Sequence, residues 1–250
     1  MPADIFWCSA FLDFTPAAFE AGGQFWAEVT GYRVSPFRGE QNQFATLLPP
    51  VGDSFLRVQR LGAGPSRVHL DLHVPDPTAS ARTAVELGAT IAFAAPDDYV
   101  VLTSPAGLTF CFVTHSAGHR PPPTRWGEHS SLVDQVCLDV PAADADRETE
   151  FWATLTGWAP RSSSAPQFRP LQRPAGMPLR LMIQIVGDDR QPATAHLDLA
   201  CDDRAAETER HQVLGAAVRT VAEHYTVLTD PAGSAYCITD RDPVTGLLPR

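Results

Sequence analysis

The sequence predicts an α+β fold that is built twice in tandem from one repeated set of strands and helices. Three observations support this prediction: blocks of sequence recur at a constant spacing, a proline-rich stretch separates the two copies, and each copy mixes short alternating strands with amphipathic helices. At 250 residues the chain is long enough for two domains of ordinary size.

Four sequence blocks recur in the same order in the two copies. Phe25-Trp-Ala returns at Phe151, an offset of 151 − 25 = 126 residues, and His69-Leu-Asp-Leu returns at His196, an offset of 196 − 69 = 127. Two further blocks, Leu-Gly-Ala and Val-Leu-Thr-(Ser/Asp)-Pro-Ala-Gly, keep the same spacing. The two halves are therefore predicted to be homologous domains.

The repeat also predicts the domain boundaries. The first domain is expected over residues 1–115 and the second over 130–242, followed by a C-terminal tail over 243–250. Residues 116–129 contain Pro121-Pro-Pro123, which predicts a stiff, extended linker.

Within each copy, hydrophobic periodicity predicts a β-α-β-β-β order, twice over. In the second copy the first helix is expected to end at Gly157, a residue type that favours a helix C-terminus, and Asp230-Pro-Ala-Gly is expected to form a type I turn. The predicted helices are 144–156 and 203–214, and the predicted strands are 132–140, 167–171, 180–186, 195–201, 217–221, 225–229 and 235–239.

Composition excludes several classes of function. The net charge is 19 − 29 = −10 without a basic cluster, which argues against nucleic-acid or membrane partners. Every basic residue is Arg, so Schiff-base lysine chemistry is excluded. The five cysteines form no CxxC pair and no signal peptide is recognised, so we expect a cytoplasmic protein, monomeric or homodimeric, with a small-molecule partner.

Strand alternation places a set of polar residues on one face of the predicted sheets. In the strand near 67–74, His69 and Asp71 lie opposite an apolar face, and His196 and Asp198 repeat this pattern. This polar face is expected to be the concave face of the sheet. The same alternation in other strands places further residues on it, namely Cys111, Cys237, Gln59, Gln184, Ser9 and Gln135.

Two aromatic pairs recur across the repeat. Tyr99 and Tyr225 begin equivalent strands and are expected either to cap the mouth of a cavity or to pack in the core. Trp26 and Trp152 are expected to be core residues of helices.

The joint order of these motifs, with HLDL opening the second unit of each half and (S/D)PAG before its last strand, resembles the vicinal-oxygen-chelate superfamily of glyoxalases, bleomycin-resistance proteins and dioxygenases. It is most similar to the glyoxalase-like domain proteins. The resemblance covers nearly the whole chain. It implies two tandem domains, each made of two βαβββ modules whose curved sheets enclose a cavity.

The resemblance also implies where a metal would bind. Metal-binding members of the superfamily draw mostly His and Glu ligands from the first, fourth, fifth and eighth strands. Here those positions match well only at the histidines, so no tightly bound metal cofactor is expected, although weak divalent binding stays open. Asp198, on the same face as His196, could swing in as a further donor. The two sets of positions are Ser9, Gln59, His69, Cys111 and Gln135, Gln184, His196, Cys237.

Two functions follow from these residues, and whether the chain is an enzyme stays open. The first is metal-independent binding of a small organic molecule in the cavity, as in resistance or sequestration proteins. The alternative is a glyoxalase-like lyase or isomerase in which His196 is a general base oriented by Asp198, with metal assistance through Gln135 and Gln184 or nucleophilic help from Cys237. The remaining ligand-binding candidates are His69, Asp71, Gln59, Cys111, Tyr99 and Tyr225.

Overall fold

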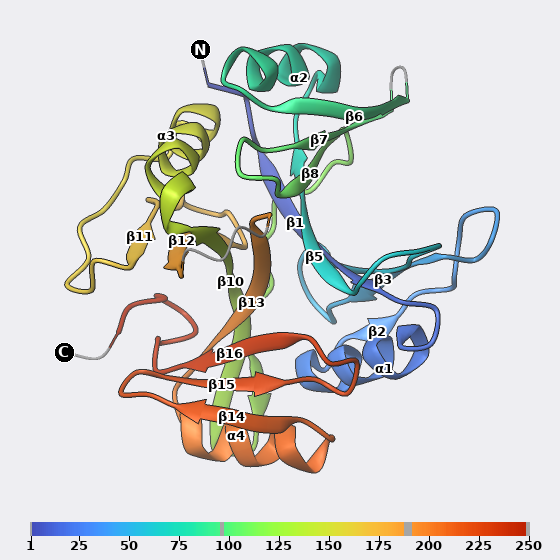
Figure 1. The fold of residues 1–250 in the computed structure, drawn as a ribbon. Helices are drawn as coiled ribbons and strands as arrows, with labels where there is room; N and C mark the ends of the chain where they lie inside the picture. Colours follow the sequence, from blue (N-terminus) through green and yellow to red (C-terminus); the bar gives the residue numbers. More distant parts are fainter. Residues whose placement is uncertain (1, 96–97, 188–191, 249–250) are drawn as a thin grey trace. The chain divides into compact units, whose positions relative to one another are not determined.

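The computed structural model describes residues 2–95, 98–187 and 192–248, and both halves of the chain show a closely similar succession of strands and two helices (Figure 1). This confirms the predicted α+β class with an internal repeat. In the described residues no helix is long and apolar enough to span a membrane.

The first half contains two helices and eight strands. Its elements are β1 (Trp7–Phe14), α1 (Phe19–Thr30), β2 (Arg33–Val34), β3 (Phe44–Leu48), β4 (Leu56–Arg60), β5 (Arg67–His73), α2 (Pro77–Glu86), β6 (Thr90–Ala95), β7 (Tyr99–Thr103) and β8 (Thr109–Val113).

The second half repeats this plan with two strands, not three, between its first helix and the HLDL strand, and the elements predicted for it lie within three residues of their predicted bounds. Its elements are β9 (Thr124–Trp126), β10 (His129–Pro141), the 3₁₀ turn η1 (Ala142–Asp144), α3 (Ala145–Thr156), β11 (Phe168–Pro170), β12 (Arg180–Val186), β13 (Thr194–Cys201), α4 (Arg204–Val213), β14 (Ala217–Val221), β15 (Tyr225–Thr229) and β16 (Ala235–Thr239).

Each half forms one mixed sheet of eight strands. The strand order is β2-β3-β4-β1-β5-β8-β7-β6 in the first half and β11-β12-β10-β13-β16-β15-β14 in the second, where β9 adds to β10. The pairs β5–β8 and β13–β16 are parallel, whereas β7–β8 and β15–β16 are antiparallel hairpins. The parallel pairs bring the HLDL strand of each half beside its last strand.

Local sequence explains where the helices begin and end. Helix α3 ends at Gly157, which adopts the left-handed conformation with φ +70° that glycine tolerates best. Helix α4 begins at Asp203, whose side chain accepts a hydrogen bond from the Ala206 backbone N–H at 3.0 Å. The turn at Asp230 is closed by the Gly233 N–H, which donates to the Asp230 carbonyl at 2.9 Å.

The proline-rich stretch is irregular up to Pro123, but its last part forms β9, which the sequence analysis does not predict. Ser130 and Ser131 of β10 pair with Arg125 and Thr124 of this short strand. A hairpin of three residues a side is too short to give a periodic hydrophobic signal, which is why composition alone suggested an extended linker.

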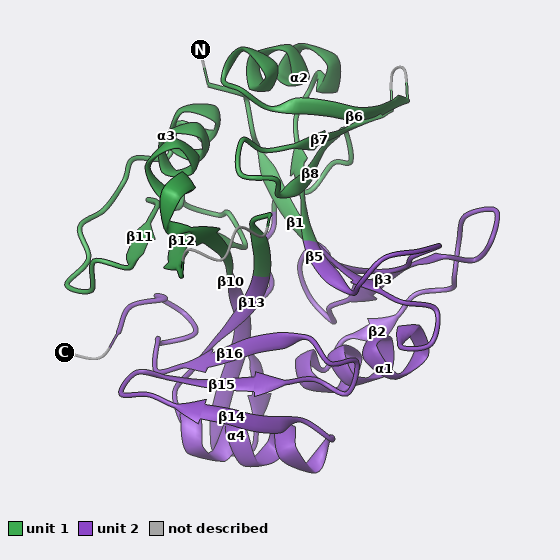
Figure 2. Ribbon diagram, in the orientation of Figure 1, with its two compact units in different colours: residues 1–10, 69–118, 136–195 green, residues 11–68, 119–135, 196–250 purple. Residues whose placement is uncertain are grey.

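The chain packs into two compact units that cut across the sequence repeat (Figure 2). Unit 1 comprises residues 1–10, 69–118 and 136–195, and unit 2 comprises 11–68, 119–135 and 196–250. Each unit therefore takes one helix-bearing module from each half. Unit 1 holds α2 and α3, and unit 2 holds α1 and α4.

Equivalent aromatic contacts lie in the core of each unit. In unit 1 the Trp152 ring lies 5.1 Å from the Phe110 ring, and in unit 2 the Trp26 ring lies 5.2 Å from the Tyr236 ring. Both tryptophans are fully buried, which confirms that they are core residues.

Candidate functional site in each half

The HLDL motif of the second half lies on β13, beside β16. Alternation puts His196 and Asp198 on one face of β13. In the parallel register Asp198 is paired with Cys237 of β16, so this thiol shares the face of the carboxylate. All three side chains are buried, although this face of the strand is slightly more exposed to solvent than its leucine face.

The three side chains converge on one ring nitrogen. His196 Nε2 lies 3.3 Å from Asp198 Oδ1 and 3.7 Å from Cys237 Sγ. In a nucleophilic triad the base contacts the nucleophile through one ring nitrogen and the orienting carboxylate through the other. Here the carboxylate and the thiol face the same nitrogen, an arrangement that suits ligands around a shared cation better than a proton relay.

The two oxygens of Asp198 have different surroundings. Oδ2 accepts a hydrogen bond of 2.6 Å from Gln135 Nε2 and lies 3.8 Å from Arg241 Nη1. Within the described part of the chain, Oδ1 is buried, accepts no hydrogen bond of regular geometry and lies 3.3 Å from His196 Nε2. A buried carboxylate oxygen of this kind needs positive charge nearby, which His196 and Arg241 can supply and to which a bound cation would add.

Asp198 remains ionised in this setting. Burial by itself raises the pKa of a carboxyl group, but the His196 imidazole, the Arg241 guanidinium and the Gln135 amide outweigh it and hold the pKa of Asp198 below its usual value. The site therefore offers a carboxylate, not a carboxylic acid, at neutral pH.

Arg241 and Asp134 belong to the surroundings of this site and were missed by sequence reasoning. Arg241 Nη2 lies 2.6 Å from Asp134 Oδ1, and both side chains are largely buried. The guanidinium thus lies between Asp134, near the middle of β10, and the carboxylate of Asp198. Arg241 lies beyond the last predicted strand, in a run of charged residues that resembles a solvated tail, so periodicity carried no signal for it.

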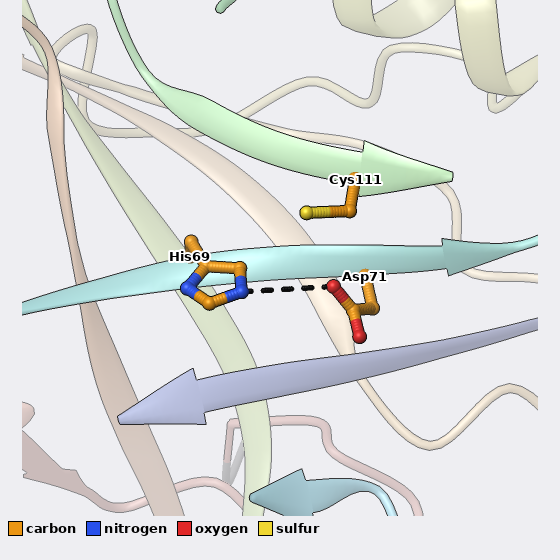
Figure 3. A group of neighbouring side chains, drawn as sticks. All are labelled: His69, Asp71 and Cys111. Carbon is orange, nitrogen blue, oxygen red and sulfur yellow. Dashed lines mark ion pairs between the residues drawn. The ribbon is translucent and has the colours of Figure 1, made fainter. Parts of the chain in front are cut away.

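The first half contains a cluster of the same composition. His69 and Asp71 come from β5 and Cys111 from β8, and Asp71 pairs with Cys111 in the parallel register (Figure 3). His69 Nε2 lies 3.6 Å from Asp71 Oδ1, and the three side chains are buried. Because the register matches that of Asp198 and Cys237, both halves place the same three residue types together.

The surroundings of the two clusters differ at the first strand of each half. Ser9, the counterpart of Gln135, lies with its Oγ 2.8 Å from His73 Nε2, while His73 Nδ1 lies 2.6 Å from the His115 carbonyl. A carbonyl only accepts, so Nδ1 carries the proton and Nε2 accepts from the serine hydroxyl. The Ser9 hydroxyl is thereby used by His73, whereas Gln135 reaches the carboxylate of its cluster.

The two predicted glutamines on the fourth-strand positions lie on β4 and β12. Gln59 is half-buried and pairs with Phe44, and Gln184 pairs with Phe168 and accepts a hydrogen bond of 3.5 Å from the Cys137 thiol. Gln59 belongs to unit 2 while His69 belongs to unit 1, and Gln184 and His196 are divided between the units as well. Their role as ligand-binding residues stays a prediction.

The two tyrosines lie on the cluster face of their sheets. Tyr225 begins β15 and is half-buried. Val227, two residues further along β15 and therefore on the same face, pairs directly with Cys237. Because facing residues of an antiparallel pair point to the same side, the Tyr225 ring shares a face with the thiol. Tyr99 and Val101 have the same relation to Cys111.

The structure does not test the predicted cavity. In unit 2 a cavity of about 10 Å³, enough for one water, is lined by Tyr32, Ser131 and Leu199 among others and by none of the predicted site residues. An enclosed ligand cavity beside the clusters stays a prediction.

Comparison with known proteins places these observations in a family. A family model described as the glyoxalase-like domain matches residues 9–113 and, a second time, residues 135–239. Both matches begin at a first-strand position, Ser9 or Gln135; the first match includes His69, Asp71 and Cys111, and the second includes His196, Asp198 and Cys237. No curated protein matches the chain.

Solved structures share the fold over nearly the whole chain. The Mn(II)-bound glyoxalase from Novosphingobium aromaticivorans is 17% identical with a TM-score of 0.65, covering 98% of this chain and 86% of that one. The 2,2',3-trihydroxybiphenyl 1,2-dioxygenase from Sphingomonas wittichii is 14% identical with a TM-score of 0.63, covering 98% and 95%. A mutant 4-hydroxymandelate synthase from Streptomyces coelicolor is 15% identical with a TM-score of 0.62, covering 99% and 95%. At these identities the likeness is one of fold.

Proposed function

Because this chain belongs to the glyoxalase-like domain family of the vicinal-oxygen-chelate superfamily, with one copy in each half, we propose that it binds a small organic molecule beside a divalent metal ion held by His196, Asp198 and Cys237. The observation that carries the proposal is the convergence of an imidazole, a carboxylate and a thiol, whose donor atoms all lie within 4.8 Å of one another.

The spacing of the donors fits a metal ion. Two ligand atoms at zinc-like bond lengths and a tetrahedral angle are about 3.4 Å apart for nitrogen and oxygen and about 3.6 Å apart for nitrogen and sulfur. The distances from His196 Nε2 are 3.3 Å to Asp198 Oδ1 and 3.7 Å to Cys237 Sγ. The buried oxygen without a regular hydrogen bond is the atom that points into this space.

Sequence reasoning favoured a metal-free binder because it counted two neutral amides as ligands. The structure supports a different set of metal ligands, because the Gln135 amide donates a hydrogen bond to Asp198 and so orients this carboxylate; it is not itself counted as a ligand. Asp198 thereby replaces an amide in the candidate sphere, and a carboxylate is a far better cation ligand.

The donors and their neighbours have distinct roles in the proposed site. Three protein donors leave a coordination position open, where a bound divalent cation would polarise an oxygen atom of the organic ligand. Gln135 keeps Asp198 aligned, and Arg241 balances its charge at 3.8 Å. Tyr225, on the face of Cys237, offers an aromatic surface for an apolar part of the ligand.

The second candidate function is metal-free binding, as in resistance or sequestration proteins. The observation that favours it is the buried His196–Asp198 ion pair, which can also form with a proton on Nε2 and no cation. The chain would then hold its ligand by shape and aromatic surface alone, and neither lyase nor isomerase chemistry would follow.

Metal analysis separates the two candidates. The protein is stripped with a chelator, reloaded with Zn²⁺, desalted and analysed by mass spectrometry, for the wild type, His196→Ala and the control Cys201→Ser, a buried thiol outside the cluster. We expect retained zinc in the wild type and the control, with loss of one ion per chain in His196→Ala. Zinc-dependent binding of acetohydroxamate, a bidentate oxygen ligand, is expected to follow the same pattern. If the wild type retains no more zinc than His196→Ala, the metal-free candidate replaces this one.

A further inference from the structure

We propose that strand β6 of the first half is a dimerisation edge, along which two copies of the chain pair antiparallel about a two-fold axis. The first sheet ends at β6, because its strand order finishes β8-β7-β6 and β7 is the one strand that pairs with β6 among the described residues. The outer edge of β6 therefore presents a row of backbone N–H and C=O groups that another strand can pair. This inference is independent of the proposed metal site.

The composition of β6 leaves this edge unprotected. Its six residues, Thr90–Ala95, include no charged residue and no proline, and five of them are exposed. Ile91 is 46% exposed and Phe93 is 52% exposed, although both are large apolar residues. Natural sheets protect an exposed edge with a charged side chain, a proline or a very short strand. An uncharged, apolar edge is instead a template for pairing with another chain.

The strands at the other three ends of the two sheet orders have the protection that β6 lacks. β2 has two residues, and β11 has three residues and ends at Pro170. β14 is the counterpart of β6 in the second half, and it carries Arg219 where β6 has Ala92, an offset of 219 − 92 = 127 residues. Both strands have a bulge at this position, so the bulge does not distinguish the two edges, whereas the charge does.

Charge and symmetry favour a second copy of the chain as the occupant of this edge. The chain has a net charge of −10, so two copies repel each other least through a surface without charged residues, and β6 is such a surface. A two-fold axis brings the same residues of both copies together. Two β14 edges paired in this way would place two Arg219 side chains near each other, which destabilises a strand pair. One unprotected edge per chain closes the assembly at two copies.

The surface beside the edge can add to the contact. Phe93 lies next to Tyr99 of β7, with ring centroids 5.8 Å apart, so a strand along β6 would cover an aromatic pair. Helix α2 packs on β6 (Figure 1), and its Val85 is 43% exposed. The second edge also exposes valines, but Thr220 occupies the position of Phe93 there. The aromatic pair and the lack of charge therefore distinguish the β6 edge.

Sedimentation velocity of the full chain over a concentration series tests the proposal. Ala92→Arg gives β6 the charge that Arg219 gives β14, and the matched control Val218→Arg places the same charge on the second edge. Both positions are exposed, so both variants should fold, which circular dichroism and the denaturation midpoint check. Amide hydrogen exchange of the wild type, measured at low and high concentration, locates the interface without any substitution.

We expect the wild type and Val218→Arg to reach twice the monomer mass of 27.1 kDa as the concentration rises, and Ala92→Arg to stay monomeric. Exchange in residues 90–95 of the wild type should slow on dimerisation. A wild type that stays monomeric at every concentration, a dimer that survives in Ala92→Arg, or exchange in β6 that is equal in monomer and dimer would each overturn the proposal. Species that grow beyond two copies would overturn the closed two-fold pairing.

Discussion

Replacing Gln135 by Leu should weaken metal binding in the second half without removing any ligand. Gln135 Nε2 donates a hydrogen bond of 2.6 Å to Asp198 Oδ2, and both side chains are buried. Leucine keeps the approximate volume of the side chain but removes the donor. The carboxylate is then left with a longer contact to Arg241 and loses the group that fixes its orientation.

The size of the effect follows from the kind of hydrogen bond that is lost. A hydrogen bond to a charged group contributes about 1.5–3 kcal/mol, and a tenfold change in affinity corresponds to about 1.4 kcal/mol. Loss of a partner that orients a metal ligand typically costs about 10–100-fold in metal affinity. We therefore expect zinc affinity at the second-half site to fall by about 10–100-fold.

Competition with a chromophoric zinc chelator measures this change. The matched control is Ser9→Ala, because Ser9 occupies the equivalent position of the first half and its hydroxyl bonds His73, not the carboxylate of the cluster. Zinc affinity of the control should stay within about twofold of the wild type. An unchanged affinity in Gln135→Leu, or an equal loss in Ser9→Ala, would refute the orienting role of the amide.

Two further predictions concern stability in unit 2. Burial lowers the pKa of His211 below 6.5, although the hydrogen bond and the charge of Glu207 oppose this shift. Between the two pKa values the unfolded chain binds more protons than the folded one, so stability is full above pH 6.5 and falls as the pH drops below it. The urea midpoint should therefore be lower at pH 5.5 than at pH 7.5, with a smaller difference in His211→Gln. A higher midpoint at pH 5.5 would contradict this sign. Gly22→Ala should destabilise the fold by about 1–3 kcal/mol, because the new Cβ would lie 2.5 Å from the buried Phe14 ring. The control Gly23→Ala should not destabilise it, because a Cβ at that position meets no atom within 4 Å. Similar denaturation midpoints for the two variants would contradict the packing argument.

Most of the fold could be predicted because its signals are local and occur twice. The strand from Thr194 to Cys201 and the helix that follows it were predicted within two residues, since alternation and the capping Asp203 mark them directly. The residue types of each cluster were also predicted, because strand alternation places His196 and Asp198 on one face.

What could not be predicted depends on contacts between distant segments. In unit 2 the Trp26 indole donates to the carboxylate of Asp230 at 3.0 Å. In unit 1 the equivalent turn carries Ser104, and the carboxylate comes instead from Glu148 on α3, which accepts from the Trp152 indole at 2.7 Å. Glu148 also accepts a hydrogen bond of 2.9 Å from the Ala106 backbone N–H of the other half. The contacts of Trp26 with Asp230 and of Ala106 with Glu148 each join the two halves, so the sequence of one half alone does not predict them.

The same limit applies to the candidate site. The sequence placed Asp198 beside His196 but could not show that Gln135 binds the carboxylate, which turns a rival ligand into a supporting residue. Nor could it bring Arg241, beyond the last strand, to the cluster. Both contacts join side chains from different segments of the chain, and hydrophobic periodicity within one segment does not predict such contacts.

X-ray absorption at the zinc edge of the reconstituted protein tests the central claim most directly, because it reports the atoms bound to the metal. We predict a sulfur scatterer at about 2.3 Å together with nitrogen and oxygen scatterers at about 2.0–2.2 Å, and loss of the sulfur contribution in the Cys237→Ser variant. A set of bound atoms made only of nitrogen and oxygen in the wild type would contradict the assignment of His196, Asp198 and Cys237 as metal ligands.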